Sequence, residues 1–245
     1  MSVFDPHGLL PGALLELGLA LPPAVCDRLL AHLGLISKWN QVYNLTAVRD
    51  PADMVTHHLL DSLAAVRPLA EFLVRPPVWS PAEGAPQQTV THVLDVGSGA
   101  GFPGVTLAMA LPEVLAHSCG AGVGRASVRV TCVDAVAKKA AFIRQVAVEL
   151  GLGALTAAHG RIEAMATASA DVITCRAFAN LSDIVRLTSR HLVPGGVWMA
   201  FKGVLPHDEI AALPADIEVF HVEPLRVPGL DARRCLIWMR QRRST

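Results

Sequence analysis

The stretch VLDVGSGAGFPG at 93–104 constrains the fold more than any other part of the chain. The run VLDV is apolar apart from Asp95, and Gly97, Gly99 and Gly101 follow it at alternate positions. Because glycine has no Cβ, the backbone can turn tightly there and come close to a ligand. A short strand that ends in such a turn and leads into a helix is typical of doubly wound α/β domains that bind a cofactor at the turn.

The rest of the C-terminal region repeats the pattern of a short apolar strand and a helix-period segment. This alternation predicts an α/β fold with a doubly wound, mostly parallel sheet. Two last strand-like runs face each other across a loop with Pro and Gly, which predicts an antiparallel C-terminal hairpin at the sheet edge. We expect strands at 92–96, 128–134, 155–160, 171–177, 197–203, 217–223 and 234–240, helices at about 136–150 and 184–191, and a turn at LVPGG, 192–196.

The N-terminal region has the period of helices instead of strands. Apolar residues recur at helical spacing over 9–43, on both sides of the Pro-Pro pair at 22–23. A second helix is expected to begin with Asp50 as its N-cap and to end at about Val66, before Pro68. The N-terminal region is therefore expected to be a helical extension of the α/β domain.

Two stretches without periodicity divide the chain. Residues 75–90 hold four prolines and predict a linker or loop. Residues 116–127 are rich in Gly, Ala and Ser and predict a surface insertion. We therefore expect the helical extension at 1–74, the linker at 75–90 and the α/β domain at 91–245.

Charge and cysteine content limit the partners and the location. Lys plus Arg number 21, as do Asp plus Glu, so an RNA partner would need a local basic patch. The five cysteines show no C-x-x-C spacing and the ten histidines no metal spacing, so we expect neither disulfides nor a metal. The longest apolar run, 9–25, is interrupted by Glu16 and prolines, so it predicts no membrane span. A cytoplasmic protein, and a monomer, is expected.

A glycine turn alone does not choose the cofactor, since dinucleotide oxidoreductases share it. Pro103 removes a backbone N–H from the turn, where a pyrophosphate would need donors. Asp134 ends the next strand, as expected of an acid that accepts hydrogen bonds from ribose hydroxyls. The run LVPGG is a turn common in class I methyltransferases. These features favour a methyltransferase, although a tight turn without ligand, and a surface position for Asp134, stay open.

Beyond these residues, the sequence resembles the 16S rRNA guanine-N7 methyltransferases, the glucose-inhibited division protein B family. The resemblance spans about residues 25–240, and its motifs together are more specific than a glycine turn. They are KWNQVYNLTAVRDP at 38–51, HLLDS at 58–62, GSGAGFPG at 97–104, RIE at 161–163, CRAFANL at 175–181 and FKG at 201–203.

The resemblance implies a class I methyltransferase with a Rossmann-like fold, with S-adenosylmethionine as cofactor and a guanine N7 in 16S ribosomal RNA as substrate. It also implies a role for each residue that matches a family motif. The cofactor would be held by Gly97, Gly99 and Phe102 in the turn, Asp134 at the ribose, Ile162 and Glu163 at the adenine, and Arg176 near the methyl group. For Arg176 a solvent-facing ion pair stays open.

The chain departs from the family pattern at a few positions. Ala135 stands where the family usually has a serine after the acid, and Ala164 replaces a second acid. The stretches at 75–90 and 116–127 are longer than in the compact family pattern. None of these changes touches the glycine turn.

The expected chemistry needs no general base, because guanine N7 already carries an exposed lone pair. Catalysis would then rest on proximity and on accommodating the developing cation. Substrate contacts are expected from Asn44, His58, Arg176 and Lys202. A basic patch could be supplied by Arg49, Arg67, Lys138, Lys139, Arg144, Arg240, Arg242 and Arg243. The alternatives are a helix-closing Asn44, an internal polar pair of His58 with Asp61, and a plain surface Lys202.

Three other functions stay open at this point. The nearest is an S-adenosylmethionine-dependent methyltransferase that acts on a small molecule or a protein, which would show no RNA-dependent turnover. The second is a nicotinamide oxidoreductase, which would bind NADH. The third is a partner protein that kept the fold without activity. If RNA is the substrate, an accessible loop guanine is expected, because the A-form major groove is too narrow to be read.

Overall fold

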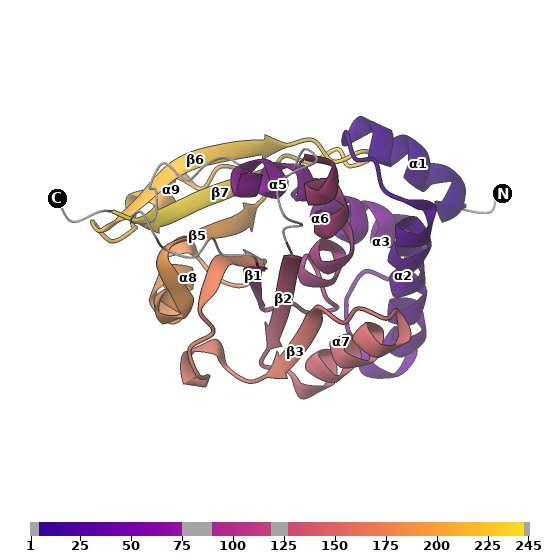
Figure 1. Ribbon diagram of the computed structural model, residues 1–245, viewed down its shortest axis with the longest axis horizontal. Helices are drawn as coiled ribbons and strands as arrows, with labels where there is room; N and C mark the ends of the chain where they lie inside the picture. Colours follow the sequence, from indigo (N-terminus) through magenta and orange to yellow (C-terminus); the bar gives the residue numbers. More distant parts are fainter. Residues whose placement is uncertain (1–4, 75–89, 119–126, 243–245) are drawn as a thin grey trace.

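The computed structural model describes residues 5–74, 90–118 and 127–242. At its centre lies a seven-stranded sheet in the order β3-β2-β1-β4-β5-β7-β6 (Figure 1). The strands are β1 Val90–Val96, β2 Ser127–Asp134, β3 Leu155–His159, β4 Ala170–Arg176, β5 Leu192–Lys202, β6 Ile217–Leu225 and β7 Arg234–Gln241.

The first five strands run parallel, and β7 pairs antiparallel with both β5 and β6. The predicted doubly wound sheet and C-terminal hairpin are therefore confirmed. The chain order reverses between β1 and β4, which are direct neighbours. Ligands of open α/β sheets bind at the carboxyl ends of the strands at such a point.

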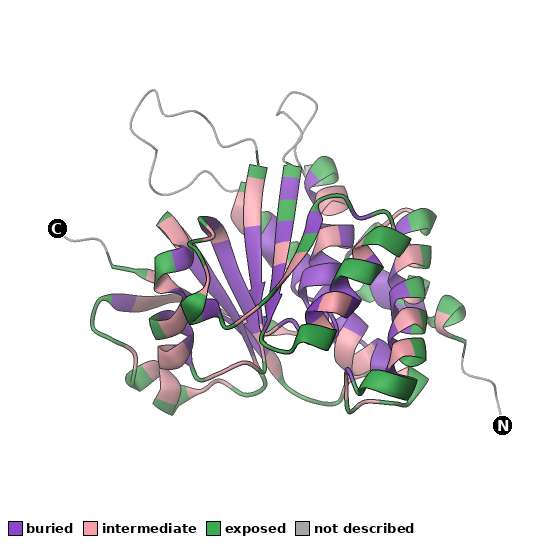
Figure 2. Cartoon of the chain, turned by 90° about the horizontal axis from the view of Figure 1, so that it is seen from below, coloured by how far each residue is buried: buried purple, intermediate pink, exposed green. Residues whose placement is uncertain are grey.

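Helices cover both faces of the sheet, and alternate strand residues point into two hydrophobic clusters. Val93 belongs to one cluster and Leu94 to the other, as the period of a strand requires. The first face carries α6 Gly104–Ser118, α7 Ala137–Glu149 and the N-terminal helices, and the second carries α8 Leu181–Thr188 and α9 His207–Ala211. The buried strands lie between these helices in Figure 2.

The N-terminal helices pack directly on the α/β part. They are α1 Pro6–Glu16, α2 Pro23–Tyr43, α3 Pro51–Met54, the π-helical turn η1 Val55–Leu60, α4 Asp61–Leu63 and α5 Val66–Val74. Leu29 of α2 and Leu69 of α5 lie in the same cluster as residues of α6 and β2. The division at 1–74, 75–90 and 91–245 stays a prediction, and 75–89 lies outside the described residues.

The predicted end of the second helix needs a correction. After a two-residue turn the chain enters α5 at Val66 and stays helical to Val74. Pro68 lies in the first turn of α5, where backbone N–H groups have no partner inside the helix, so a proline is tolerated there. The N-cap prediction for Asp50 is confirmed, since its side chain accepts from Ala52 N and Asp53 N.

The predicted turn at LVPGG is also wrong, because these residues form the beginning of β5. Leu192 pairs with Ala170, and the register shifts before Val197 pairs with Val172. Gly195 has a φ of 82°, which lets the strand take up its extra residues in a bulge. The predicted insertion at 116–127 begins later, since α6 runs to Ser118, and 119–126 lies outside the described residues.

No helix in the described ranges is long and apolar enough to span a bilayer.

Candidate active site

The glycine turn joins the carboxyl end of β1 to α6. Gly99 and Gly101 have φ values of 58° and 97°, a region that side chains with a Cβ rarely adopt. A Cβ at Gly101 would lie 2.4 Å from Cγ2 of Val105, so this glycine is needed for packing. A Cβ at Gly99 would meet nothing nearer than the Gly97 carbonyl at 4.0 Å. The turn is therefore open at Gly99 and closed at Gly101.

Most backbone N–H groups of the turn donate inside the protein, and among its described residues only Ala100 N lacks an acceptor. Gly97 N and Ser98 N both donate to the carbonyl of Val133, at 2.8 and 3.2 Å. Gly101 N and Phe102 N donate to the carbonyl of Ser98, at 2.8 and 3.0 Å. A loop that binds a pyrophosphate keeps such donors free for its ligand. This turn is therefore not prepared for a pyrophosphate.

Asp95 takes the place that an anion would have at the start of α6. Its Oδ2 accepts from Gly104 N at 3.0 Å, and the residue is fully buried. Burial raises the pKa of Asp95 to about 6, while the Gly104 hydrogen bond opposes that rise. At neutral pH the carboxylate therefore places a negative charge below the turn. Asp95 has no predicted role above, although an acid inside an apolar strand is a signal of one.

Asp134 lies at the end of β2, beside the turn, and is 7% exposed. Its Oδ2 accepts from Gly99 N at 2.9 Å and its Oδ1 from Val136 N at 2.8 Å. A carboxylate oxygen can accept more than one hydrogen bond, so both oxygens keep acceptor capacity for ribose hydroxyls. The carbonyl of Asp134 also accepts from Gly160 N, which ties β2 to the segment after β3.

The expected adenine contacts lie in the 3₁₀ turn η2, Ile162–Ala164. Ile162 is buried, and its carbonyl accepts from Nε2 of His191 at 3.0 Å. Glu163 is exposed, and its side chain lies 3.7 Å from Arg161. The structure brings this turn to the end of β3, next to the end of β2 where Asp134 lies. The adenine role of both residues stays a prediction.

Arg176, at the end of β4, is half-buried and contacts the N-terminal helices. Its Nη1 donates to Oδ2 of Asp61 and to the carbonyl of His57, each at 2.9 Å. Asp61 is 3% exposed, and its Oδ1 accepts from Nε of Arg234 at 3.1 Å. The ion pair left open for Arg176 exists, but its acid is buried. From the sequence, Asp61 was expected only as a partner of His58. Its contact with Arg234 was not predicted.

His58 belongs to the same group of polar side chains. Nδ1 of His58 lies 3.1 Å from Nη2 of Arg176 and 3.2 Å from the His57 carbonyl. An arginine only donates, and the His57 carbonyl already accepts from Arg176, so we assign Nδ1 as the acceptor. The proton on Nε2 then donates to Oγ1 of Thr46 at 2.8 Å. Burial, followed by the nearby Arg176 charge, lowers the pKa of His58 to about 4. His58 is therefore a neutral internal hydrogen-bonding group, and a role toward substrate stays a prediction.

Phe102 points its ring toward the N-terminal helices. The residue is 3% exposed, and its ring centroid lies 4.9 Å from that of His32 and 5.2 Å from that of His58. The Arg176 guanidinium lies 5.4 Å from the ring centroid. The Phe102 side chain therefore links the turn to α2 and η1, and its contact with the cofactor stays a prediction.

Lys202 and Asn44 make intramolecular contacts. Nζ of Lys202 donates to both carboxylate oxygens of Glu209, at 2.7 and 3.0 Å, and to the Ala179 carbonyl at 3.1 Å. Asn44 closes α2 with a φ of 46°, and its Oδ1 accepts from Arg49 at 2.8 Å. Either residue would have to exchange these partners to contact a substrate, and both contacts stay predictions.

Phe178 was named in a motif without a role, yet it lies against the turn. A Cβ at Gly97 would come within 2.7 Å of Cδ2 of Phe178. Ala177 before it has a φ of 52°, a conformation uncommon for a residue with a Cβ. The segment after β4 therefore closes over the end of β1.

The site consists of an open turn with most of its N–H donors used, an acceptor at the end of β2 and a polar group that links β4 to the N-terminal helices. A family model described as "rRNA small subunit methyltransferase G" matches residues 25–237. The chain belongs to this family.

Relatives within this family match almost the whole chain. "Ribosomal RNA small subunit methyltransferase G" of Methylibium petroleiphilum is 52% identical, with 99% of each chain covered. The protein of the same name from Acidovorax ebreus is also 52% identical, over 96% of this chain and 94% of its own. The similarity to the family therefore covers nearly all of this chain.

A solved structure supports the fold. A SAM-dependent methyltransferase from Aquifex aeolicus superposes with a TM-score of 0.50 at 15% identity, over 80% of this chain and 96% of that one. At that identity the likeness concerns the fold alone, which is that of the class I methyltransferases. In the described ranges no three His, Cys, Asp or Glu side chains are grouped to hold a metal.

Proposed function

We propose that this chain transfers the methyl group of S-adenosylmethionine to N7 of an accessible loop guanine in 16S ribosomal RNA of the bacterial small subunit. The reaction class, methyl transfer, and the substrate, RNA of the small subunit, are inferred from the names of the family and of the relatives. The observation that carries the cofactor is the use of the turn's N–H groups within the protein.

That observation distinguishes a sulfonium cofactor from a dinucleotide. A pyrophosphate is an anion and needs free donors, whereas the amino acid end of S-adenosylmethionine carries a sulfonium and an ammonium against one carboxylate, a net charge of +1. Here Gly99 N donates to Asp134, and the Asp95 carboxylate occupies the start of α6. Two acidic side chains thus accept from backbone N–H groups of the turn and of the start of α6, which favours a cationic ligand and counts against the nicotinamide oxidoreductase.

The residues present fit the cofactor. The open side of Gly99 gives it room to approach, and a Cβ there would fill that space. Asp134 keeps acceptor capacity for ribose hydroxyls, and Ile162 with Glu163 would border the adenine. When bound, the cofactor supplies an electrophilic methyl group on a positively charged sulfur.

The chain's own residues contribute alignment, with no proton acceptor. Guanine N7 has a free lone pair, so no side chain has to remove a proton before the methyl transfer. Proximity and orientation can supply roughly 7 to 11 kcal/mol of the barrier. Asp61 holds the Arg176 guanidinium at the end of β4, and the neutral His58 fixes its second nitrogen.

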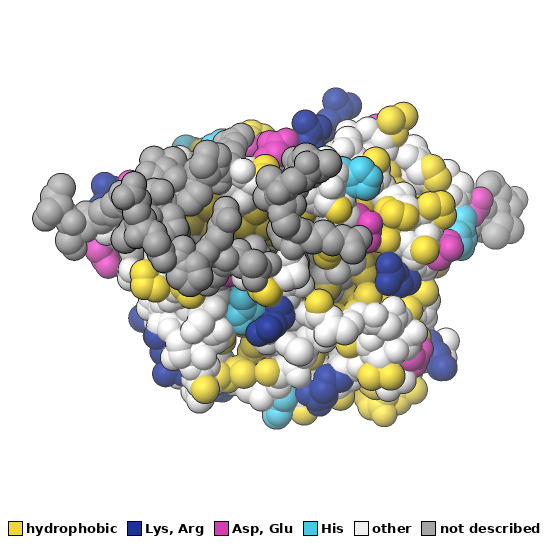
Figure 3. Space-filling view, in the orientation of Figure 1, with side chains coloured by type: hydrophobic (Ala, Val, Ile, Leu, Met, Phe, Trp, Pro, Cys, Tyr) yellow, Lys and Arg dark blue, Asp and Glu magenta, His cyan; other side chains and the backbone are white. Residues whose placement is uncertain are grey.

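The RNA side of the site is proposed from the N-terminal helices and the ends of β4 and β5. Lys and Arg side chains are dispersed over the face shown in Figure 3, which suits recognition by shape more than by bulk charge. Of the basic residues named above, Lys138 is exposed and Lys139 half-buried on α7, and Arg243 lies outside the described residues. We also propose that the protein acts in the cytoplasm as a monomer.

The test is a methyl-transfer assay with labelled S-adenosylmethionine. Small subunits that lack the modification, naked 16S RNA and a no-RNA sample are incubated with the protein, and the labelled nucleotide is mapped. We expect label on one guanine N7 and none without RNA. Label that appears without RNA would support the methyltransferase for a small molecule or protein. Cofactor binding without any transfer would support the inactive partner protein.

A further inference from the structure

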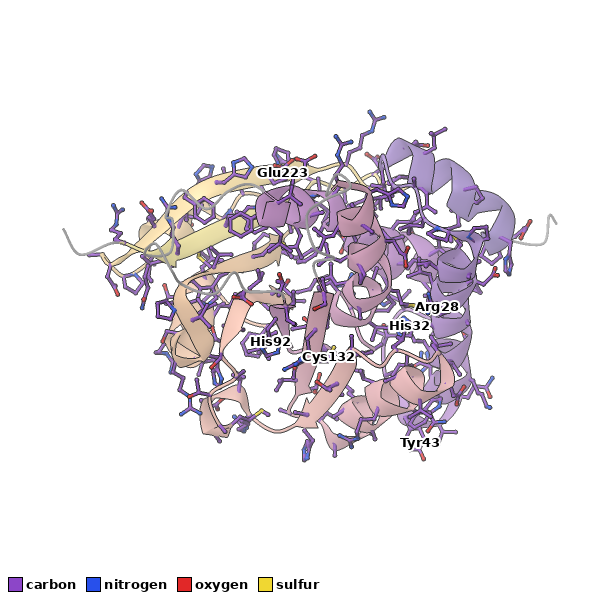
Figure 4. The ribbon with its side chains drawn as sticks, viewed as in Figure 1. Arg28, His32, Tyr43, His92, Cys132 and Glu223 are labelled. Atoms are coloured by element: carbon purple, nitrogen blue, oxygen red, sulfur yellow. The ribbon has the colours of Figure 1, made fainter. Side chains whose placement is uncertain are left out.

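A histidine lies on the apolar face of α2 and has no exposed surface. His32 is fully buried, in the same stripe as Leu29, Leu33 and Ile36. Figure 4 shows it on the side of α2 that faces the sheet. A buried polar ring is costly unless it is hydrogen-bonded. Nδ1 of His32 has no partner among the described residues, so its one hydrogen bond, from Nε2, indicates its role.

Nε2 of His32 lies 2.9 Å from the carbonyl oxygen of Ala100, inside the glycine turn. A carbonyl only accepts, so Nε2 must carry the proton and donate it. Ala100 lies between Gly99, where the turn is open, and Gly101, where it is closed. This hydrogen bond is therefore a direct link from the N-terminal helices to the centre of the turn.

The ring of His32 also packs against the turn, on the side of Gly101. Its centroid lies 4.9 Å from Phe102 and 6.0 Å from Phe142 of α7. A Cβ at Gly101 would lie 3.3 Å from Nε2 of His32. The imidazole thus fills the space between α2, α7 and the turn, on the side away from the open Gly99.

We propose that His32 is a positioning residue that holds the glycine turn in its cofactor-binding conformation through the Ala100 hydrogen bond. The inference rests on the cofactor assignment above and extends it to a residue of α2. His32 lies on the side of the turn away from Gly99, where the cofactor would approach, so it acts through Ala100 and Phe102. Without the donor, the turn has more conformations available, and the cofactor must pay the entropy of ordering it.

Two variants separate the donor from the ring. In His32→Gln the amide nitrogen lies as many bonds from Cβ as Nε2 does and can donate to Ala100, while the ring is lost. In His32→Phe the ring is kept and the donor is lost. Thr188→Val serves as control, because Thr188 is a buried residue of α8 that accepts from Nε1 of Trp198 at 2.8 Å.

The experiment measures S-adenosylhomocysteine binding by calorimetry, and thermal unfolding, for all four proteins. We expect His32→Phe to weaken binding about tenfold, the size of one lost hydrogen bond, while His32→Gln stays within about twofold. Thr188→Val should unfold at a lower temperature with unchanged binding. In turnover assays His32→Phe should raise KM for S-adenosylmethionine and leave kcat at saturation within about twofold of wild type.

Wild-type binding by His32→Phe would overturn the proposal. Equal weakening by Thr188→Val at a similar unfolding temperature would overturn it too, because the loss would then follow general stability. If the wild-type protein itself bound no S-adenosylhomocysteine, the cofactor assignment would fail instead, so the two failures are distinguishable.

Discussion

The carboxylate of Asp134 accepts a hydrogen bond from the backbone N–H of Gly99 at 2.9 Å. The acid expected to hold the ribose therefore also shapes the turn that the cofactor approaches. Both effects depend on acceptors at Asp134, so they should be lost together.

Replacement of Asp134 tests this double role. Asp134→Asn keeps the size of the side chain but turns one acceptor into a donor. We expect S-adenosylhomocysteine affinity to fall by about one to two orders of magnitude, as for the loss of one or two charge-assisted hydrogen bonds. Calorimetry measures it, with the exposed Asp208→Asn as control. Unchanged affinity in Asp134→Asn would remove Asp134 from the site.

Gly99 has a matched control elsewhere in the chain. Gly99 and Gly151 have φ values of 58° and 64°, and neither has an atom nearer than 4.0 Å to an added Cβ. Gly99→Val and Gly151→Val should both lose about 1 to 3 kcal/mol of stability through backbone strain. Only Gly99→Val should abolish cofactor binding, because its side chain enters the approach path. If both variants bind equally well, the path lies elsewhere.

The buried acid Asp61 should matter for stability. Asp61→Ala leaves Arg176 and Arg234 without their carboxylate, and breaking a buried ion pair costs about 3 to 5 kcal/mol. Arg176 and Arg234 are partly exposed, so we expect a loss of about 3 kcal/mol or somewhat less. Urea unfolding measures the loss. Asp183→Ala, which breaks the exposed pair with Arg186, should change little.

Acid should destabilise the protein through its buried histidines. Burial lowers the pKa of His32 and His58 to about 4, so the unfolded chain takes up these protons first as the pH falls below 6.5. The free energy of unfolding should therefore decrease from pH 6.5 to 4. Asp95 acts in the opposite direction, because its raised pKa of about 6 makes the folded state bind a proton before the unfolded state does.

Asp95→Asn removes that opposing contribution. Its free energy of unfolding should fall more steeply than that of wild type between pH 6 and 4, by roughly 3 kcal/mol over the range. Chemical denaturation at several pH values measures both slopes. Parallel slopes would mean that Asp95 does not titrate as its burial implies.

Much of the fold could be predicted because strands and helices have local signals. The seven strands, the hairpin and the N-cap at Asp50 follow from periodicity and turn chemistry, which involve neighbours in the sequence. The two wrong predictions concern residues that are compatible with two local structures. Pro68 can precede a helix end or lie in a first turn, and Gly195 can make a turn or a bulge inside a strand.

The site divides in the same way. The glycine turn at the end of β1, the acid at the end of β2 and, through the motifs, the family can all be recognised from the order of the residues. The partners of Arg176, Lys202 and Phe102 become known only from the folded chain. Arg176 and Asp61 are 115 residues apart, and His32 and Ala100 are 68 apart. Such pairs form only when the N-terminal helices pack on the sheet, and no pattern of neighbouring residues specifies which side chains then meet.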